Sequence, residues 1–268
     1  MAVPWLDQLQ TERCQVIKLA DPLVYRVLKR FFPGEISKQN AHRSHLEPYE
    51  SRIVKAAGLE TWNSWKSGTI LDFGCGAGEG AIQLAVAGAR RVIGIDIRPD
   101  LIASARSRAI ETDVADRCKF SLETPEEVVD TIISIDAFEH FKDPAAVLVA
   151  MSNMLADDGR VVASFGPVWY HPRGGHLFSV FPWAHLLLSE SALCRWRRDF
   201  RDDGATKFSE VTGGLNGMTI HRFEELLNDS PLQIDKLSHR PIYVLRYLHN
   251  RWTREFFTSV TDCILVKR

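Results

Sequence analysis

Glycines at alternating positions follow a short apolar run and precede a segment of helical character. Asp72 is followed by Gly74, Gly76 and Gly78. Glycine lets a backbone turn sharply and approach a ligand closely, and the free amides at the start of a helix attract a carboxylate or a phosphate. Asp96 lies about 20 residues further on, where an acidic side chain can accept hydrogen bonds from both ribose hydroxyls. The loop and Asp96 together predict a cofactor that contains a nucleoside.

Two classes of cofactor compete for this loop. Residues 76–81 can be aligned with the relaxed dinucleotide fingerprint that ends in alanine. Against this, the carboxylate of Asp72 would repel a pyrophosphate, whereas it would attract a cofactor that carries positive charge. A tight turn without any ligand is the remaining alternative, and the agreement of strand, glycines, helix and downstream acid argues against it.

Three histidines that could act as a base come after the Gly-rich loop and Asp96 in the sequence. Imidazole titrates near neutrality, so His140, beside Glu139, is a candidate general base that takes a proton from a hydroxyl nucleophile. His171 and His176 are alternative bases further along the chain. The competing interpretation is structural: Glu139 and His140 cap a turn, and His171 and His176 are satisfied surface or core residues.

Residues 167–218 are rich in Trp, His, Pro and Gly and do not alternate between strand and helix. The segment is too long for an ordinary connection, so we expect it to be structured and functional. Aromatic walls with a few polar groups suit an organic substrate and exclude water, which favours a substrate lid. The candidate substrate-binding residues are Trp169, Tyr170, Arg173, Phe178 and Asn216. Asn216 either points into the pocket or adopts a left-handed turn.

Predicted strands and helices alternate before this lid. Short apolar runs predict strands at 69–73, 91–96, 118–122, 131–135 and 160–165. Helices are expected at 79–87, from Pro99 to about 110, and from Asp143–Pro144, where Asp suits the cap and Pro the first helical position. This alternation predicts a parallel sheet with helices on both faces, with ligands beyond the carboxyl ends of its strands.

The flanking segments complete the prediction of an α/β fold, a Rossmann-like, mostly parallel seven-stranded sheet. Residues 1–66 predict a helical N-terminal cap, with an apolar stripe at Val24, Val27, Leu28 and Phe31. Residues 67–166 are expected to form the cofactor-binding core, followed by the inserted lid. Residues 219–268 return to the core, with a helix at 219–227 and strands at 232–237 and 263–266. The basic and aromatic stretch 241–255 receives no assignment.

Composition excludes several classes of protein. The 268 residues carry 33 basic and 34 acidic side chains, so the net charge of −1 provides no global attraction to nucleic acid or anionic membrane. Five scattered cysteines without a CxxC pair favour neither a zinc site nor a disulfide framework, which predicts a reduced, cytoplasmic protein. We expect no membrane span and no leader sequence. The sequence does not determine the oligomeric state.

The register Asp-x-Gly-x-Gly-x-Gly from Asp72 to Gly78 resembles motif I of the class I S-adenosylmethionine-dependent methyltransferases. Residues 92–96 are similar to the second motif of this family, and residues 129–134 to its fourth strand. Residues 138–141, followed by Asp143–Pro144, are similar to the small-molecule subgroup called type 11. The resemblance covers about residues 68–166. It implies S-adenosyl-L-methionine as the cofactor, and its ammonium and sulfonium groups explain the carboxylate at position 72.

The resemblance also implies roles for single residues. Asp72 and the glycine backbone would hold the methionine part, Asp96 would hold the ribose, and Ile97 would lie against the adenine. The cofactor-binding set also includes Gly74, Cys75, Gly76, Gly78, Glu123 and Ser134. Glu123 is the nearest candidate for the adenine amino group, because the Gly-Asp signature that the family carries after its third strand is absent here.

A metal is the alternative role for the residues after the fourth strand. Asp136, Glu139 and His140 resemble in spacing the carboxylate–carboxylate–His set of ubiquinone-biosynthesis O-methyltransferases. This chain has Asp where that family has Glu, and Mg²⁺ accepts carboxylates and water more readily than His. We therefore expect no metal, with Mg²⁺ at these three residues as the alternative.

These observations predict a methyltransferase that moves a methyl group from S-adenosylmethionine to a small organic acceptor, with oxygen as the expected nucleophile. We expect a small-molecule substrate and no nucleic acid. The alternatives are an enzyme that acts on RNA or protein, a non-catalytic binding protein that keeps the cofactor fold, and a nicotinamide oxidoreductase. The sequence does not identify the acceptor.

Overall fold

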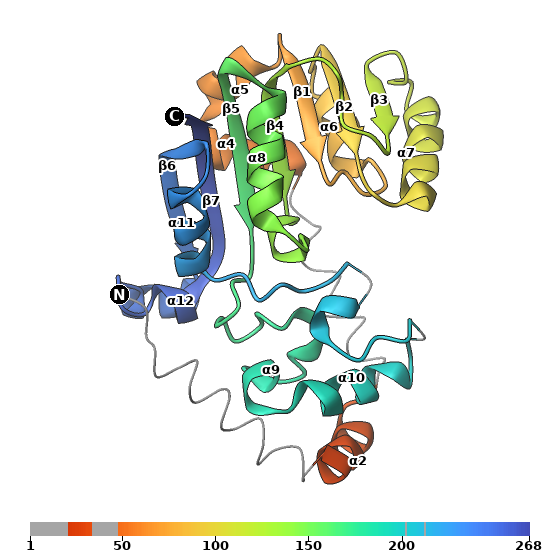
Figure 1. Ribbon diagram of the computed structural model, residues 1–268, viewed down its shortest axis with the longest axis vertical. Coiled ribbons are helices and arrows are strands. Elements are labelled where there is room, and N and C mark those ends of the chain that lie inside the picture. The colour runs from red at the N-terminus through yellow and green to blue at the C-terminus, as the bar shows by residue number, and fades with distance from the viewer. Residues whose placement is uncertain (1–20, 34–47, 202, 212) are drawn as a thin grey trace.

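A seven-stranded sheet is the centre of the computed structural model, which describes residues 21–33, 48–201, 203–211 and 213–268 (Figure 1). The strands are β1 (Thr69–Phe73), β2 (Arg91–Ile95), β3 (Cys118–Ser121), β4 (Val129–Ile135), β5 (Leu155–Phe165), β6 (Leu232–Pro241) and β7 (Thr258–Lys267). Their order is β3-β2-β1-β4-β5-β7-β6. The first five are parallel, and β7 runs antiparallel to β5 and β6. The predicted fold class is confirmed.

The strand order reverses between β1 and β4, in the middle of the sheet. Strand β1 pairs with β2 on one side and with β4 on the other. Chain connections therefore leave β1 and β4 in opposite directions, and the crevice between their carboxyl ends is where such sheets bind ligands. The Gly-rich loop and the turn at 136–140 follow these two strands.

Helices cover both faces of the sheet. One face carries α4 (Tyr49–Ala57), α5 (Leu59–Trp65), α6 (Glu79–Val86) and α7 (Pro99–Glu111), and the other carries α8 (Pro144–Met154) and α11 (Ile220–Asn228). Alternate strand residues serve the two cores: Ile70 packs with the first group and Leu71 with the second. The predicted start of α8 is confirmed, since the Asp143 carboxylate accepts the Ala146 amide at 3.0 Å and Pro144 follows.

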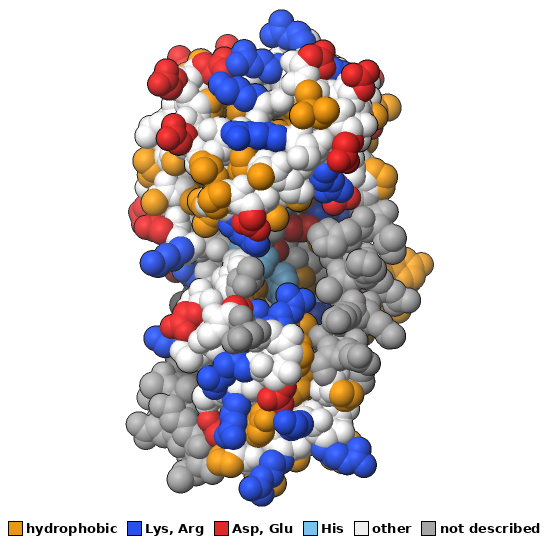
Figure 2. All heavy atoms as spheres, turned by 90° about the vertical axis from the view of Figure 1, so that its right-hand side faces the viewer, with side chains coloured by type: hydrophobic (Ala, Val, Ile, Leu, Met, Phe, Trp, Pro, Cys, Tyr) orange, Lys and Arg blue, Asp and Glu red, His pale blue; other side chains and the backbone are white. Residues whose placement is uncertain are grey.

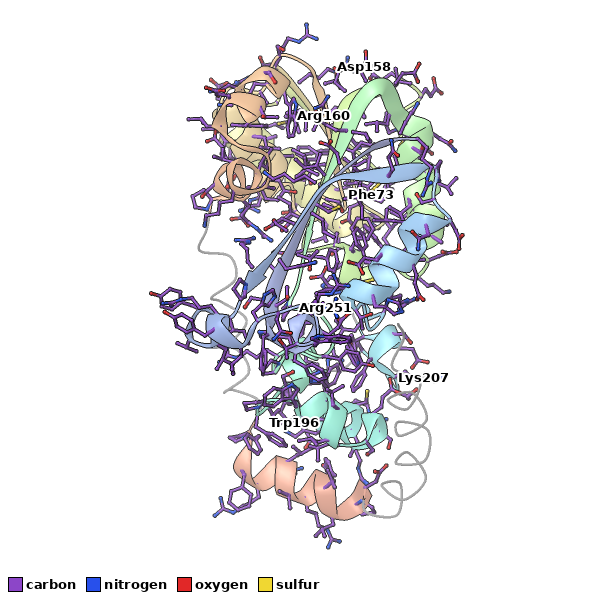
Figure 3. All side chains as sticks on the ribbon, turned by 90° about the vertical axis from the view of Figure 1, so that its left-hand side faces the viewer. Phe73, Asp158, Arg160, Trp196, Lys207 and Arg251 are labelled. Carbon is purple, nitrogen blue, oxygen red and sulfur yellow. The ribbon has the colours of Figure 1, made fainter. Side chains whose placement is uncertain are left out.

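The lid has an apolar core of its own. The lid contains helices α9 (Ala184–Leu187) and α10 (Glu190–Arg198) and the 3-10 turns η3 (His176–Phe178) and η4 (Phe208–Glu210). Residues of α10, η3 and η4 form one apolar cluster with α2 (Asp21–Phe31). Figure 2 shows a hollow between the sheet part and the lid, with histidine side chains visible in it. Trp196, labelled in Figure 3, donates from Nε1 to the Phe32 carbonyl at 2.7 Å and so ties α10 to the end of α2.

Some elements differ from the sequence prediction. In α2 only Leu28 of the predicted stripe is fully buried, whereas Val27 and Phe31 are exposed, because among the described elements this helix packs on the lid by one side only. Strand β5 begins at Leu155 rather than 160, and residues 156–159 bulge between its pairings with Val129 and Thr131. The unassigned stretch contains the turn η5 (Tyr243–Leu248) and α12 (Arg254–Phe257), which connect β6 to β7. Within the described ranges, no helix has the length and apolar character to cross a membrane.

Candidate functional site

Left-handed glycines shape the loop after β1. Gly74, Gly76 and Gly78 have φ angles of 83°, 53° and 76°, a conformation that side chains disfavour. A Cβ at Gly78 would lie 2.7 Å from that of Ala105, so this glycine permits close packing of α6 and α7. A Cβ at Gly76 would meet nothing within 4 Å. The loop is therefore packed at Gly78 and open at Gly76, where a ligand can approach.

Asp96 ties this loop to the end of β2. Its carboxylate accepts the Gly76 amide at 2.9 Å and the Arg98 amide at 3.0 Å. Each oxygen keeps lone-pair capacity for a further donor, because a carboxylate has about four acceptor sites. The neighbouring Ile97 is 91% exposed, so its side chain offers an apolar surface beside the carboxylate. Asp96 and Ile97 are accessible side by side at the end of β2, and their contacts with a ribose and a base stay predictions.

The remaining predicted cofactor residues are less accessible, apart from Glu123. Glu123 is exposed on the loop after β3, with its amide bonded to Ser121 Oγ. Ser134 is fully buried and donates its hydroxyl to the Phe73 carbonyl at 3.2 Å. Cys75 is buried with its thiol beneath the loop. Contacts of these three residues with a cofactor stay predictions.

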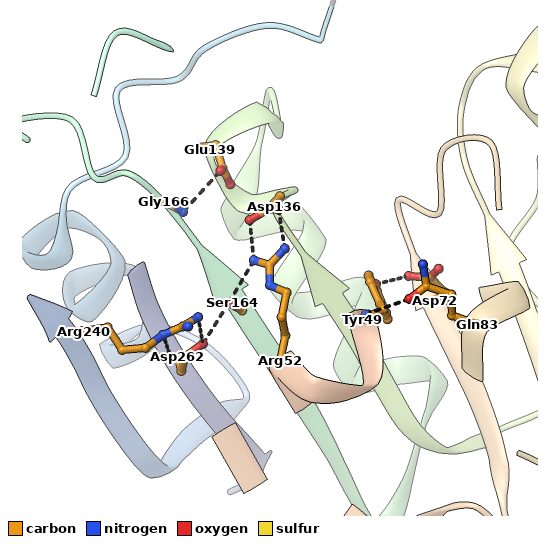
Figure 4. Close-up of polar contacts among 10 residues, drawn as sticks. All are labelled: Tyr49, Arg52, Asp72, Gln83, Asp136, Glu139, Ser164, Gly166, Arg240 and Asp262. Atoms are coloured by element: carbon orange, nitrogen blue, oxygen red, sulfur yellow. Dashed lines mark hydrogen bonds and ion pairs between the residues drawn. The ribbon is translucent and has the colours of Figure 1, made fainter. Parts of the chain in front are cut away.

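The carboxylate of Asp72 is enclosed rather than open to the crevice. It accepts the Tyr49 hydroxyl at 2.6 Å, as Figure 4 shows, and the Ala81 amide. Burial raises the pKa of Asp72 to about 6, and the charge of Asp96 adds to the shift, against the two hydrogen bonds. In this arrangement Asp72 holds the loop to α4 and α6, and direct contact with a cofactor ammonium stays a prediction.

A second carboxylate, Asp136 after β4, is paired with α4 as well. The Arg52 guanidinium donates to both of its oxygens, at 2.5 and 2.6 Å. Figure 4 shows how the contacts continue: Ser164 lies 3.4 Å from Arg52 and donates to Asp262 at 2.8 Å. Asp136 has a left-handed φ of 54°, a strained conformation for a residue with a side chain. The ion pair holds this turn against the N-terminal helix.

Glu139 is buried in the same turn, and only one of its two carboxyl oxygens has a hydrogen-bond partner. One carboxyl oxygen accepts the Gly166 amide at 3.2 Å (Figure 4), and the other is buried without a hydrogen bond. Burial raises the pKa of Glu139 to about 8, and the negative charge of Asp136 adds to the shift. The carboxyl group therefore holds a proton at neutral pH and is a donor rather than a base.

Replacing Glu139 by glutamine is expected to remove one contribution to the pH dependence of stability between pH 5 and 8. The folded protein keeps a proton up to a pKa of about 8 that the unfolded chain releases near 4.5, so the contribution of Glu139 to stability falls as pH rises through this window. At about 1.4 kcal/mol per pKa unit, the loss amounts to about 4–5 kcal/mol. Urea unfolding at several pH values measures it. Glu123→Gln, on an exposed loop, is the control, and parallel curves for E139Q and wild type would contradict the assignment.

His140 has the tautomer of a general base. Its Nδ1 lies 2.6 Å from the Gly214 carbonyl oxygen. Because a carbonyl oxygen only accepts, the neutral ring carries its proton on Nδ1 and keeps a lone pair on Nε2. The ring is half-buried, and its centroid lies 5.4 Å from that of His176.

The other two predicted bases are engaged or enclosed. His171 Nδ1 accepts the Arg173 amide at 2.9 Å, which places the proton of the neutral ring on Nε2. Burial, with the charge of Arg173, lowers the pKa of His171 to about 4. Burial, with His140 beside it, lowers the pKa of His176 to about 4, and its Nε2 is enclosed without a partner. Of the three, His140 has the better geometry for accepting a proton.

The lid side chains have different surroundings. Trp169 packs on Phe208, with ring centroids 5.7 Å apart, and Tyr170 packs on Phe256 at 5.6 Å. Arg173 is exposed, and Phe178 is buried in the lid core, away from any substrate in this conformation. Substrate contacts of these residues stay predictions.

Asn216 joins the lid to the turn after β4. Its side-chain amide donates to the carbonyls of Phe138, at 2.7 Å, and Phe141, at 2.9 Å, and its backbone amide donates to the backbone carbonyl of Glu139 at 3.0 Å. The alternative of a left-handed turn at Asn216 is wrong, because the left-handed residues here are Gly213, Gly214 and Gly217. These glycines make the turns, so Asn216 is left to bind the turn that carries His140.

The alternative metal set does not converge. Asp136 is held by Arg52, Glu139 by the Gly166 amide and His140 by Gly214. Over the described ranges, no three His, Cys, Asp or Glu side chains group as ligands of one metal ion.

Tyr49 and Arg52, which bond to the carboxylates of Asp72 and Asp136, were not identified from the sequence. With Ile53 and Ala56 they occupy one face of α4, at the spacing of a buried helical stripe. A tyrosine and an arginine within such a stripe require buried partners. That pattern could have indicated that Tyr49 and Arg52 have buried partners, although it does not identify the carboxylates that they contact.

Comparisons with known proteins agree with the geometry. Residues 65–167 match a family model described as a methyltransferase domain. The chain is 35% identical over 101 residues to a ubiquinone biosynthesis O-methyltransferase of Neisseria meningitidis (35% of this chain, 42% of the relative). It is 40% identical over 109 residues to a ribosomal protein L11 methyltransferase of Erwinia tasmaniensis (41% of this chain, 32% of the relative). The chain therefore spans less than half the length of these curated relatives.

A solved structure shares the fold. The mitomycin 7-O-methyltransferase MmcR superposes with a TM-score of 0.55 over 91% of this chain and 60% of the other, at 16% identity. At that identity the likeness concerns the fold alone. The family match, the strand order and the Gly-rich loop agree with one another. Residues 65–167 of this chain therefore match a methyltransferase domain in sequence, and the strand order is in keeping with that match.

Proposed function

We propose that this protein transfers a methyl group from S-adenosylmethionine to a hydroxyl group of a small organic acceptor. The observation that carries the proposal is the free lone pair on His140 Nε2, in a turn packed against the cofactor loop. The two are adjacent, since a Cβ at Gly74 would lie 3.3 Å from that of Ala137. The relatives named for O-methylation support the choice of an oxygen nucleophile.

The residues present fit the cofactor. Asp96 has spare acceptor capacity for the ribose hydroxyls, and the loop is open at Gly76. Asp72 is held by Tyr49 and Ala81, so its contribution is to fix the loop. When bound, S-adenosylmethionine supplies an electrophilic methyl group on a cationic sulfur.

The residues of the chain then position the acceptor and accept its proton. The lid encloses the acceptor and excludes water, so alignment supplies much of the rate. His140 Nε2 accepts the proton of the acceptor hydroxyl, while the Gly214 carbonyl holds the ring through Nδ1. Glu139, which keeps its own proton at neutral pH because its pKa is about 8, does not compete as a base.

The test uses S-adenosylmethionine with a labelled methyl group and a panel of phenolic, sugar and isoprenoid alcohols. Label in a small molecule supports the proposal. Label in RNA or protein only would favour a macromolecular substrate, an alternative that the similarity to an L11 methyltransferase keeps open. Cofactor binding without any transfer would favour a non-catalytic protein.

We further propose a cytoplasmic location. The cysteines of the described ranges, Cys75, Cys118, Cys194 and Cys263, are buried free thiols. Free thiols are typical of a reducing compartment.

A further inference from the structure

The connection between β6 and β7 carries a concentrated exposed patch. We call residues 242–253 the aromatic loop. Three of its aromatic side chains are highly exposed: Tyr243 at 77%, Tyr247 at 83% and Trp252 at 68%. Val244 at 77% and Leu248 at 53% lie between them, and no side chain of η5 is buried. In the described ranges, only Phe31 is a further exposed large aromatic residue.

The base of the aromatic loop is firmly held. The Arg254 guanidinium pairs with the Glu224 carboxylate of α11, and Glu255 accepts the amides of Ile220 and His221 at the start of the same helix. His249 Nε2 lies 2.9 Å from the Thr258 hydroxyl. The exposed side chains therefore stand on an anchored base. An ordered apolar patch that gains nothing from the fold of its own chain indicates a binding surface.

Positive charge accompanies the exposed rings. The aromatic loop has two arginines, one histidine and no acidic residue. The Arg246 guanidinium lies 4.7 Å and 4.5 Å from the ring centroids of Tyr243 and Tyr247, and that of Arg251 lies 4.4 Å from the ring of Trp252. Figure 3 shows this end of the hairpin and labels Arg251. The surface thus combines tyrosine and tryptophan with exposed aliphatic groups and cations.

This combination matches an anionic lipid surface. Tyrosine and tryptophan prefer the boundary between headgroups and acyl chains, valine and leucine prefer the acyl region, and arginine attracts anionic headgroups. A nucleic acid would use free ring faces for stacking, whereas one face of both tyrosines is covered by Arg246. Exposed valine and leucine side chains have no charge, hydrogen-bonding group or aromatic ring with which to bind a nucleic acid.

We propose that the aromatic loop docks this protein onto the surface of an anionic membrane. In this arrangement the loop lies on the surface of the bilayer. The loop is continuous with the candidate site, because Phe256 at its base packs on Tyr170 of the lid. Docking brings the lid close to the membrane and so suits an acceptor that partitions into lipid. The docking step does not rest on the proposed function, since it requires neither cofactor nor turnover.

Vesicle sedimentation of the full chain tests the proposal. Binding is expected to vesicles of phosphatidylcholine mixed with phosphatidylglycerol, and much more weakly to phosphatidylcholine alone. Each arginine near an anionic surface contributes about fivefold in affinity, so R246Q/R251Q should bind about 10- to 30-fold more weakly. Y243S/Y247S/W252S should lose binding at high salt, where only apolar insertion remains.

Two controls make the test specific. Ile110→Ser removes an apolar side chain that is 71% exposed on α7, outside the aromatic loop, and should bind as wild type does. Thermal melting checks that the variants fold, and the single variant W252S replaces the triple one if it does not. The proposal is overturned if the loop variants bind vesicles like wild type, if only single-stranded oligonucleotides bind, or if the loop instead holds two copies of the chain together in gel filtration.

Discussion

Replacing Asp96 by alanine is expected to weaken S-adenosylmethionine binding by about 10²- to 10⁴-fold. Hydrogen bonds to a charged group contribute about 1.5–3 kcal/mol each, and two ribose contacts would be lost. About 1.4 kcal/mol corresponds to a factor of ten. The change also frees the Gly76 amide, which the carboxylate holds at 2.9 Å. Isothermal titration calorimetry measures the loss directly.

Two further variants separate the causes of that loss. Asp100→Ala removes an exposed carboxylate that pairs with Arg98 and should leave the affinity unchanged. Asp96→Asn keeps the size of the side chain and one acceptor oxygen, so its affinity should lie between those of wild type and D96A. An unchanged dissociation constant for D96A would show that the ribose is not bound at this carboxylate.

Replacing His140 by alanine is expected to lower turnover by about 10²- to 10⁴-fold, the usual contribution of a general base. Cofactor affinity should be retained, because the ring contacts the lid at Gly214 rather than the glycine loop. The measurement is kcat at saturating acceptor, together with the calorimetric cofactor affinity of the same preparation.

Matched histidine variants test the specificity of this effect. His140→Gln keeps a polar side chain of similar reach without a basic nitrogen, so it should be as slow as H140A if proton transfer matters. His221→Ala, on the exposed side of α11, should have normal turnover. Near-normal turnover of H140A, with a large loss in His171→Ala or His176→Ala, would assign the base to the lid instead.

Local patterns were sufficient for the parts of the fold that depend on neighbouring residues. The apolar run 69–73, the glycines after it and the Asp143–Pro144 helix start depend on backbone geometry and capping, so the sequence alone predicts them. The same holds for Asp96 at the end of β2, whose position follows from strand length.

Contacts between distant segments were not predictable in this way. Arg52 and Asp136 are 84 residues apart, and Asn216 reaches the Phe138 carbonyl across 78 residues. Their pairing depends on how α4 and the lid pack on the sheet, and the helix and strand periodicity of the sequence does not predict that packing. The free lone pair of His140 likewise depends on a carbonyl contributed by the lid, at Gly214.

Tyr49 and Arg52 lie three positions apart in the sequence, so they extend from adjacent positions on one face of a helix. One reaches the carboxylate at the end of β1, and the other reaches the carboxylate at the end of β4. A rigid helical turn thereby fixes the spacing of the two walls of the crevice. Neither wall can move apart from the other while both contacts persist, so the width of the opening is set from outside the sheet by a segment that contributes no strand to it.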